Sequence, residues 1–364
     1  MYSKTFSRYH RGMIHEIPCK RMLILTEGKL GVFSSKTGVS VLRYRRDHCV
    51  GVLDSAYAEQ QIEDALPGTG ITGVPIFASV KDALVVKPDS VLIGIAPTGG
   101  ALPDVMRRHV VDALKNGLSI ISGLHVMLRK DPELVELASQ HNARLYDVRD
   151  VGNIQRVARG LARATRAKRV LTVGTDCNVG KMVTSLELRR AAVQAGLDAA
   201  FVATGQTGIM IEGWGLALDH AISDFTAGAA EMLVEHVADR QICFIEGQGS
   251  IAHPGYSGVT LSLLHGTCPD AMVMVTRPDR TLHNNWPDCP IAPIRQQIAL
   301  YEQMLAPLHP GKVVAIAVNT AGMTPEEAEA AIRAIAAESG LPAADPVRTG
   351  CAELLAAVRR QVGL

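Results

Sequence analysis

One stretch in the second half of the chain decides the fold: Val170-Leu171-Thr172-Val173, followed by Gly174-Thr175-Asp176-Cys177-Asn178-Val179-Gly180-Lys181-Met182. The apolar run predicts a buried strand, and the residues after Lys181 predict a helix with Val183, Leu186 and Val193 on its buried side. A strand, a glycine-bounded loop and a helix are what a phosphate-binding loop requires, because glycine lets the backbone approach an anion and the first N–H groups of the helix are unpaired. We therefore expect an anionic cofactor to be bound by Gly174, Thr175, Asn178, Val179, Gly180 and Lys181.

The loop departs from the usual phosphate-binding pattern in two ways. Its glycines, Gly174 and Gly180, are separated by five residues rather than four, and Met182 stands where nucleotide-hydrolysing proteins have Ser or Thr. That hydroxyl holds Mg²⁺ against the phosphates, and a thioether does not replace it. Thr184 and Ser185 are near in sequence but lie in other directions on the helix. These departures favour anion binding over phosphoryl transfer.

Apolar runs alternating with helical stretches continue outward from this loop in both directions. Near-continuous apolar strands of this kind are typical of parallel sheets covered on both faces, and 364 residues suit two domains. We expect an α/β protein with two doubly wound domains: a Rossmann-like domain at 1–150 and a P-loop NTPase-like domain at 151–364. The predicted strands are 22–25, 50–54, 91–95 and 118–121 in the first domain, and 170–173, 199–203, 242–245, 271–275 and 313–318 in the second.

Composition limits the classes of molecule that this protein is expected to bind. The chain has 37 basic and 36 acidic residues, so nothing favours a nucleic acid. The 7 cysteines form no C-x-x-C pair or finger-like spacing, which favours reduced thiols and no metal. The N-terminus lacks the apolar segment of a secretory signal, and no run approaches the roughly 20 apolar residues of a membrane span. We expect a cytoplasmic enzyme that acts on a small molecule, with no membrane partner.

Two further loops follow predicted strands in the second domain and supply candidate catalytic and substrate-binding side chains. One contains Glu246, Gln248, Ser250 and His253, and the other contains Thr204, Gln206 and Thr207. Because ligands collect at the carboxyl ends of parallel strands, we expect these loops to converge on Lys181. Thr204, Gln206, Thr207, Gln248 and Ser250 are the candidates for substrate binding, and Lys181, Glu246, Asp176 and His253 for catalysis.

Several of these residues have a structural alternative that the sequence leaves open. Glu246 can cap its loop, and His253 can be fixed by loop hydrogen bonds instead of acting as a base. Cys177 can be a small loop residue or carry an acyl group, with its thiol pKa lowered by the helix start and Lys181. Ser223 and Asp224 precede a predicted Ala-rich helix, where a helix N-cap is as compatible with the sequence as a ligand contact.

Three features outside these loops are ambiguous in the same way. The basic segment 150–168, which includes Arg156, is expected to be a helical connector with a solvated face. Asp54 and the loop 96–100 follow strands of the first domain, where a turn or cap is as compatible with the sequence as a ligand contact.

The second domain resembles known P-loop proteins. The segment from Gly174 to Lys181 is similar to the longer loop of the dethiobiotin synthetase and cobyrinic acid amide synthase group, and Glu246-Gly-Gln-Gly resembles that group's E-G-x-G-G segment. Asn319 resembles the Asn that contacts the nucleotide base in this class. This resemblance implies an ATP-dependent kinase or ligase as one alternative, with ATP at the loop, and a non-catalytic nucleotide- or CoA-binding protein as another.

A closer resemblance covers nearly the whole chain. The loop with Met182, the segments 203–208 and 246–254, Tyr256-Ser-Gly258, Leu264-His-Gly266 and Cys268-Pro-Asp270 look like a bacterial family linked to D-glutamate N-acetyltransferase activity in D-amino-acid catabolism. Met182 belongs to that family's pattern. The resemblance implies acetyl-CoA as the acetyl donor and an acidic amino acid, D-glutamate, as the acceptor. A homo-oligomer, most simply a dimer, is expected from the frequency of symmetric dimers among soluble enzymes.

Overall fold

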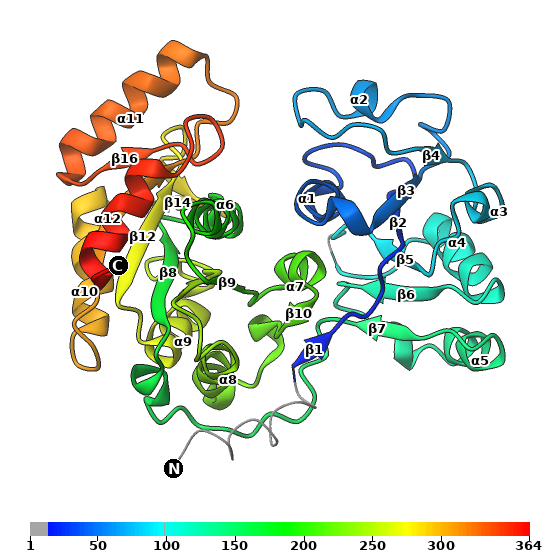
Figure 1. Cartoon of the computed structure of the whole chain (residues 1–364), viewed down its shortest axis with the longest axis horizontal. Helices are drawn as coiled ribbons and strands as arrows, with labels where there is room; N and C mark the ends of the chain where they lie inside the picture. Colours follow the sequence, from blue (N-terminus) through cyan, green and yellow to red (C-terminus); the bar gives the residue numbers. More distant parts are fainter. Residues whose placement is uncertain (1–13, 98) are drawn as a thin grey trace. The chain divides into compact units, whose positions relative to one another are not determined.

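The structure is a computed structural model, and it describes residues 14–97 and 99–364. The described chain divides into two compact units (Figure 1). The N-terminal unit comprises His15–Val151 and Gln206–Ala217, and the C-terminal unit comprises Gly152–Gly205 and Leu218–Leu364. The short segment Gln206–Ala217 therefore packs with the first unit although it lies far along the chain.

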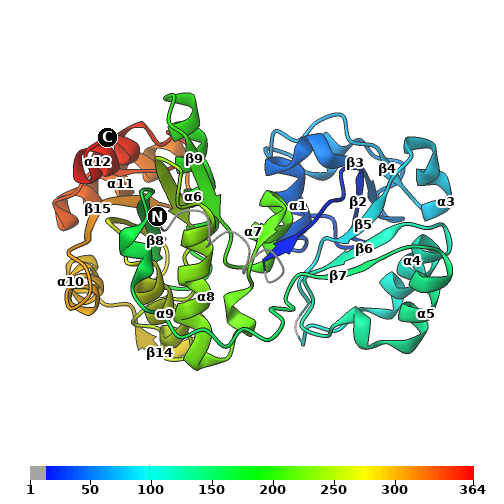
Figure 2. The same ribbon diagram turned by 60° about the horizontal axis from the view of Figure 1, so that its bottom comes forward.

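The C-terminal unit is built on a six-stranded, fully parallel sheet in the order β16-β15-β12-β8-β11-β9. Every strand residue of β9, β11 and β12 is buried, as expected for a sheet with helices on both faces. Helices α6 and α12 cover one face, while α9 and α10 cover the other, with α8 against α9 and α11 against α10 (Figures 1 and 2). The strands are β8 (Lys168–Gly174), β9 (Ala199–Val202), β11 (Ile242–Ile245), β12 (Ala271–Thr276), β15 (Lys312–Val318) and β16 (Ala343–Ala344); the helices are α6 (Lys181–Gln194), α8 (Ser223–His236), α9 (Ser257–Thr267), α10 (Ile294–Leu305), α11 (Pro325–Ser339) and α12 (Ala352–Val362).

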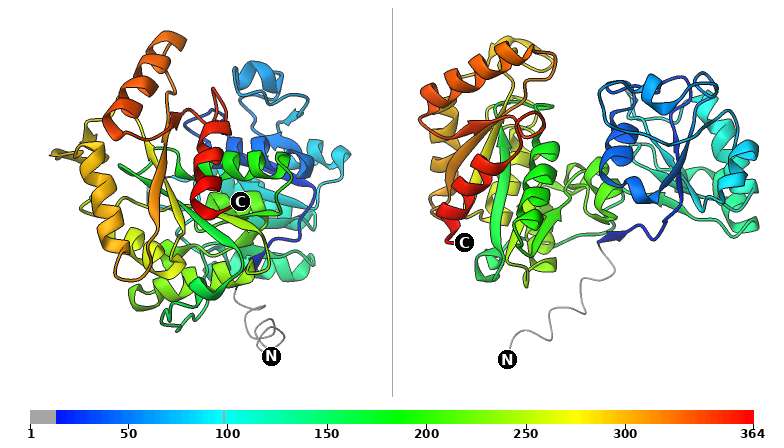
Figure 3. Two further views of the ribbon diagram at one scale, coloured as in Figure 1. Left: turned by 60° about the vertical axis from the view of Figure 1, so that its left-hand side comes forward. Right: turned by 45° about the horizontal axis from the view of Figure 1, so that its top comes forward.

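The N-terminal unit contains a second six-stranded parallel sheet, in the order β4-β3-β2-β5-β6-β7. Numbered along the chain this is the order 3-2-1-4-5-6 of dinucleotide-binding Rossmann folds. Helices α1 and α7 cover one face, and α3, α4 and α5 cover the other (Figure 1; Figure 3 gives two further views). The strands are β2 (Met22–Leu25), β3 (Cys49–Leu53), β4 (Ile76–Phe77), β5 (Ser90–Ile93), β6 (Ser119–Ser122) and β7 (Leu145–Asp147); the helices are α1 (Lys36–Tyr44), α2 (Ile62–Ala65), α3 (Val80–Ala83), α4 (Asp104–Lys115), α5 (Pro132–Gln140) and α7 (Gln206–Glu212).

Two small antiparallel pairs complete the secondary structure. Strand β1 (His15–Glu16) pairs with β10 (Trp214–Gly215), which joins the two segments of the N-terminal unit. Strand β13 (Leu282–His283) pairs with β14 (Trp286–Pro290) in the connection between β12 and α10. The predicted fold, with a Rossmann-like and a P-loop sheet, is confirmed. No helix in the described ranges is long and apolar enough to cross a bilayer.

Two local predictions are wrong, and one open alternative is excluded. The segment 150–168 is not a helix but an extended connection with one 3₁₀ turn at Leu161–Ala164, and Arg156 is not solvated, because its guanidinium bonds Glu235 and the buried carboxylate of Glu231 at 2.7 Å. Val193 is 48% exposed, since α6 instead buries Leu188 and Ala192 against the sheet. Of the two roles left open for Ser223, an N-cap or a ligand contact, the N-cap does not apply, because Ser223 lies inside the first turn of α8, whose capping position is Ile222.

Candidate functional site

The loop between β8 and α6 has the backbone shape of an anion-binding nest. Asn178 and Gly180 adopt left-handed φ values of 54° and 116°, which turn successive amides toward one another. Within the part of the chain that the structure describes, the amides of Asn178, Val179 and Gly180 have no hydrogen-bond acceptor. Asn178 itself is exposed, so the loop reaches the surface. The predicted binding residues from Gly174 to Lys181 therefore form a compact loop with donors available for an anion.

Lys181 lies inside this loop. Its side chain is only 7% exposed, and its ammonium donates to the Asp176 carbonyl at 2.8 Å. Two glycines make room for the side chain: a Cβ at Gly174 would lie 3.1 Å from Nζ, and one at Gly247 would lie 3.0 Å from Cδ and 1.7 Å from the Thr172 carbonyl oxygen. The lysine thus passes directly beside the residue that follows Glu246, with its charge held within the loop.

The hydroxyl groups around the loop are buried, and two of them have other hydrogen-bond partners. Ser185 is fully buried; its Oγ lies 2.9 Å from Thr172 Oγ1 and donates to the Ile245 carbonyl at 3.2 Å. Thr175 Oγ1 donates to Thr276 Oγ1 at 3.1 Å, and Thr184 is 2% exposed. Met182 stands where a magnesium-binding hydroxyl would be needed. The loop therefore offers amides and an ammonium group but no side-chain oxygen suited to holding Mg²⁺ beside them.

Glu246, Thr204 and Gln248 form one hydrogen-bonded group at the ends of β11 and β9. Glu246 Oε2 accepts from the amides of Thr204 at 3.0 Å and Gly205 at 3.1 Å. Thr204 Oγ1 donates to the Glu246 carbonyl at 2.7 Å and accepts from Gln248 Nε2 at 3.1 Å. The structure thus brings these three predicted residues together, and one carboxylate oxygen of Glu246 already serves to hold the neighbouring loop.

Other predicted substrate residues are placed differently. Gln206 and Thr207 begin α7 and belong to the N-terminal unit, where Thr207 Oγ1 lies 3.0 Å from Thr37 Oγ1. Ser250 is fully buried. Near it, the hydroxyl of Tyr301 donates to the Gly174 carbonyl at 2.9 Å and accepts from the Ile251 amide at 3.0 Å. Tyr301, on α10, links the two loops, and nothing in the sequence singles it out.

Asp176 is the centre of a buried polar cluster that the sequence did not reveal. Its Oδ1 accepts from His283 Nδ1 at 3.1 Å, and its Oδ2 accepts from the Asn284 amide at 2.8 Å and from Arg280 Nη1 at 2.9 Å. Burial alone would raise the pKa of Asp176, but the hydrogen bonds from His283, Asn284 and Arg280 outweigh it and hold that pKa below its ordinary value. A carboxylate held so firmly in its charged form is a poor proton acceptor, so Asp176 anchors β13 to the loop.

His253 has both ring nitrogens occupied. Nδ1 accepts from the Gly255 amide at 3.0 Å, so the ring proton is assigned to Nε2, which donates to the Asn284 carbonyl at 3.0 Å. The ring is fully buried. Of the two roles that the sequence allowed, the geometry matches a histidine fixed by loop hydrogen bonds and not a base with an available lone pair.

Asp176, His253 and His283 are close enough to be considered as metal ligands, with ligand atoms within 4.8 Å of one another. Their hydrogen bonds point to another role. A metal at His253 Nε2 would have to displace the proton given to Asn284, and one at His283 Nδ1 would have to break its bond to Asp176. The three side chains fit a hydrogen-bonded cluster beneath the loop better than a ligand set.

Cys177 and Asn319 both help to shape the loop. Burial raises the pKa of the Cys177 thiol to about 11, in spite of the nearby charges of Lys181 and Arg280, which favours the small loop residue over the acyl-carrying thiol among the two alternatives. Asn319 Nδ2 donates to the Val179 carbonyl at 2.9 Å, and its Oδ1 accepts from the Ala321 amide at 3.1 Å. Its contact with a nucleotide base stays a prediction.

Comparison with known proteins places the chain in a family. Residues 156–355 match the DUF1611_C P-loop domain, and residues 55–151 match the DUF1611_N Rossmann-like domain, each described as a domain of unknown function. The chain belongs to the DUF1611 family. A DUF1611 protein of known crystal structure, from Anabaena variabilis, is 43% identical and superposes with a TM-score of 0.86 over 94% of this chain and 99% of its own.

Two relatives of this DUF1611 chain are named as enzymes. Proteins named D-glutamate N-acetyltransferase from Tritonibacter scottomollicae and from a Pseudoalteromonas species are each 36% identical over 329 residues, which is 90% and 89% of this chain and 95% and 94% of theirs. The relatives support an acetyltransferase, and the expected family membership is confirmed.

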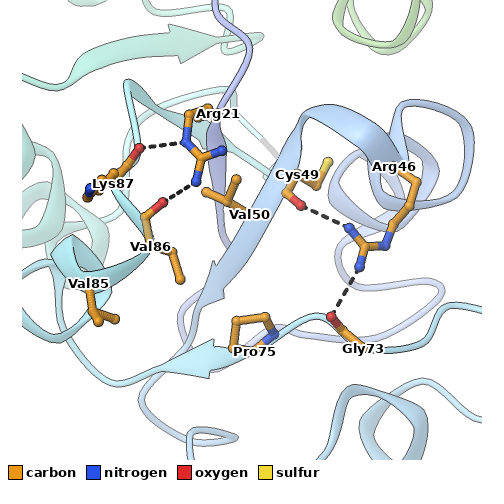
Figure 4. Close-up of a pocket in the computed structure, with 9 residues that line it drawn as sticks. All are labelled: Arg21, Arg46, Cys49, Val50, Gly73, Pro75, Val85, Val86 and Lys87. Carbon is orange, nitrogen blue, oxygen red and sulfur yellow. Dashed lines mark hydrogen bonds between the residues drawn. The ribbon is translucent and has the colours of Figure 1, made fainter.

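A pocket of about 320 Å³ lies in the N-terminal unit of this DUF1611 chain (Figure 4). It is at the amino ends of β2, β3 and β5, the edge opposite to the one where parallel sheets bind ligands. Arg21 Nε donates to the Lys87 carbonyl at 2.8 Å, and Arg46 Nη1 donates to the Cys49 carbonyl at 3.0 Å. These arginines tie chain connections together, and none of the predicted site residues lines the pocket.

Proposed function

We propose that this protein transfers an acetyl group from acetyl-CoA to the amino group of D-glutamate. The names of its two relatives support the reaction and the acceptor. The observation that supports acetyl-CoA as the acetyl donor is the loop at Asn178 to Lys181. This loop offers free amides and a buried ammonium group but no hydroxyl for Mg²⁺. Such a loop suits a ligand whose phosphates are held and not transferred.

Coenzyme A fits this description. It carries a pyrophosphate and a 3′-phosphate, and neither reacts during acetyl transfer. Amides in a nest and a lysine ammonium are the donors that bind phosphate without metal. In the proposed reaction the amine attacks the thioester carbonyl, the C–S bond breaks, CoA leaves as the thiolate, and the nitrogen loses a proton. The loop binds and orients the donor, while the chemistry takes place at its acetyl end.

The acceptor's ammonium must lose a proton before it can attack, so a base is required. Among the three candidates, Asp176 is held ionised by three donors and His253 has no available lone pair. Glu246 is buried at the end of β11, and its Oε2 accepts from the amides of Thr204 and Gly205 in the loop after β9. We therefore assign the proton-accepting role to Glu246, a step that typically contributes ~10² to 10⁴ in rate.

Purified protein mixed with acetyl-CoA and either enantiomer of glutamate tests the proposal. We expect thiol release and N-acetylglutamate by mass spectrometry with D-glutamate. Glu246→Gln should lower kcat by about 10²-fold or more while acetyl-CoA still binds in calorimetry. Absence of thiol release with both enantiomers would overturn the proposal, and Mg-ATP turnover that depends on Lys181 would replace it with an ATP-dependent kinase or ligase.

A further inference from the structure

The N-terminal unit has a ligand-binding topology of its own. Its strand order reverses between β2 and β5, and ligands of open parallel sheets bind outside the carboxyl ends of the strands at such a reversal. The connections that leave β2, β5 and β6 at this edge begin at Thr26, Gly94 and Gly123. Helix α7 reaches the same edge from far along the chain, through Gln206 and Thr207.

Direct contacts join these four segments into a ring. The Gly38 amide in the first turn of α1 donates to the Gly94 carbonyl at 2.8 Å, and the Val126 amide donates to the Gly100 carbonyl at 3.0 Å. Thr37 and Thr207 share a hydroxyl–hydroxyl bond of 3.0 Å, which joins α1 to α7.

Glycines close the same ring. A Cβ at Gly100 would lie 2.5 Å from His125 Cβ, and a Cβ at Gly123 would lie 2.9 Å from Gln206 Cγ. A Cβ at Gly38 would lie 3.2 Å from Gly94 Cα. Side chains at these positions would force the segments apart, so the close approach depends on glycine.

The charge of this ring favours an anion. The segments 34–38, 94–97, 99–100, 123–126 and 206–208 contain Lys36 and His125, both exposed, and no acidic residue. Asp54, at the end of β3, accepts from the Gly28 and Leu30 amides, and Glu27, in the connection that leaves β2, accepts from Ser55. Lysine, hydroxyl and amide donors are the groups that bind a carboxylate.

We propose that this ring at the carboxyl edge of the N-terminal sheet is the binding site for a carboxylate of an acidic amino acid, with Lys36 as its cation and the second hydroxyl proton of the Thr37–Thr207 pair as a neutral donor. The inference rests on the proposed function for the identity of the amino acid. It places the acceptor's recognition on the N-terminal unit, whose part in the reaction is otherwise unassigned.

Kinetics of the full chain at saturating acetyl-CoA test this site. Lys36→Gln should raise the KM for D-glutamate by about 10- to 100-fold, because a charged hydrogen bond is lost, and leave the Kd of acetyl-CoA within twofold. Lys36→Arg should restore most of the affinity. Thr207→Val should raise KM by about 3- to 10-fold, and Thr207→Ser should restore it.

Lys29→Gln is the matched control, because Lys29 is an exposed lysine of the same connection outside the ring. A KM unchanged in both Lys36→Gln and Thr207→Val overturns the inference, as does an equal rise in Lys29→Gln. If no acetylation is found at all, calorimetry with D-glutamate and with glutarate separates the two proposals. Binding that Lys36→Gln abolishes supports the carboxylate site without the reaction, and no binding of either compound to the wild-type protein overturns it.

Discussion

Removing the negative charge of Asp176 is the most informative perturbation of the phosphate-binding loop. In Asp176→Asn the side chain keeps its shape but loses its charge. Three donors from one downstream segment, Arg280, His283 and the Asn284 amide, converge on this buried carboxylate. The substitution therefore weakens the attachment of β13 and β14 to the loop without creating a cavity.

The expected loss of stability can be worked from these contacts. Hydrogen bonds to charged groups contribute about 1.5–3 kcal/mol each but are not additive, and breaking a buried ion pair costs about 3–5 kcal/mol. Because the asparagine oxygen still accepts one or two of the bonds, we expect a loss of about 2–4 kcal/mol. Asp279→Asn is the control: Asp279 pairs with Arg277 in the same segment at 2.6 Å, but it is 47% exposed, so its loss should be below about 1 kcal/mol.

The pH dependence of this loss has a definite sign. The folded-state pKa of Asp176 is lowered relative to the unfolded value of about 3.9. The stabilisation is therefore fully present above the unfolded pKa and is lost as the pH falls through the folded pKa. The difference between wild type and Asp176→Asn should be constant from pH 7 to about pH 5 and should shrink below about pH 4.

The fluorescence of Trp286 in β14 reports the weakened attachment of β13 and β14 to the loop. The chain has 2 tryptophans, so a Trp214→Phe background leaves Trp286 as the only tryptophan emitter. Urea titrations followed by its fluorescence at pH 7, 5 and 3 should show the earlier transition of Asp176→Asn at the two higher values. The reasoning fails if the two variants unfold together at pH 7, or if their difference grows as the pH is lowered.

Three further changes probe separate parts of the structure. Cys177→Ser should retain activity within about threefold, because a thiol with a pKa of about 11 is protonated near pH 8; a loss above a hundredfold together with an acylated Cys177 in the mass spectrum of the wild-type protein would contradict this. Glu231→Gln should lower the free energy of unfolding by about 3–5 kcal/mol, because it breaks the ion pair of the fully buried Glu231 carboxylate and leaves Arg156 with Glu235 alone, and chemical denaturation showing less than about 1 kcal/mol would be inconsistent. Lys181→Met should weaken acetyl-CoA binding by about tenfold or more in calorimetry, and an unchanged Kd would remove the lysine from the proposed cofactor site.

The fold could be predicted because its signals are local. Every long strand of both sheets is an apolar run that can be recognised without knowing its neighbours, and the loop at Gly174 is defined by adjacent residues. In the two six-stranded sheets, the strands that prediction missed are β4, β7 and β16, which have only 2, 3 and 2 residues. Segments this short carry no periodicity, and they are strands only because a longer strand lies beside them.

Contacts between residues far apart in the sequence could not be predicted, because they too depend on neighbouring segments. Thr204 and Gln206 are two residues apart, yet the first belongs to the C-terminal unit and the second to the N-terminal unit. The basic segment around Arg156 has the composition of a solvated helix, and only contact with Glu231, 75 residues later, makes it a buried connection. Asp54 looked like a cap or a ligand contact, and it instead organises the loop after β2 through Thr26, Gly28 and Leu30.

The choice of base shows why chemistry is harder to predict than architecture. Asp176, Glu246 and His253 have similar sequence settings, each in a polar loop after a buried strand. What separates them is the donors that already hold Asp176 and His253. Asp176 has three, including a guanidinium, which lowers its proton affinity, and His253 has its lone pair directed at a backbone amide. Glu246 Oε2 accepts from the amides of Thr204 and Gly205 in the loop after β9. Because the availability of a proton acceptor is set by neighbours from other strands, a carboxylate can be located from sequence, but its role follows only from the donors that surround it.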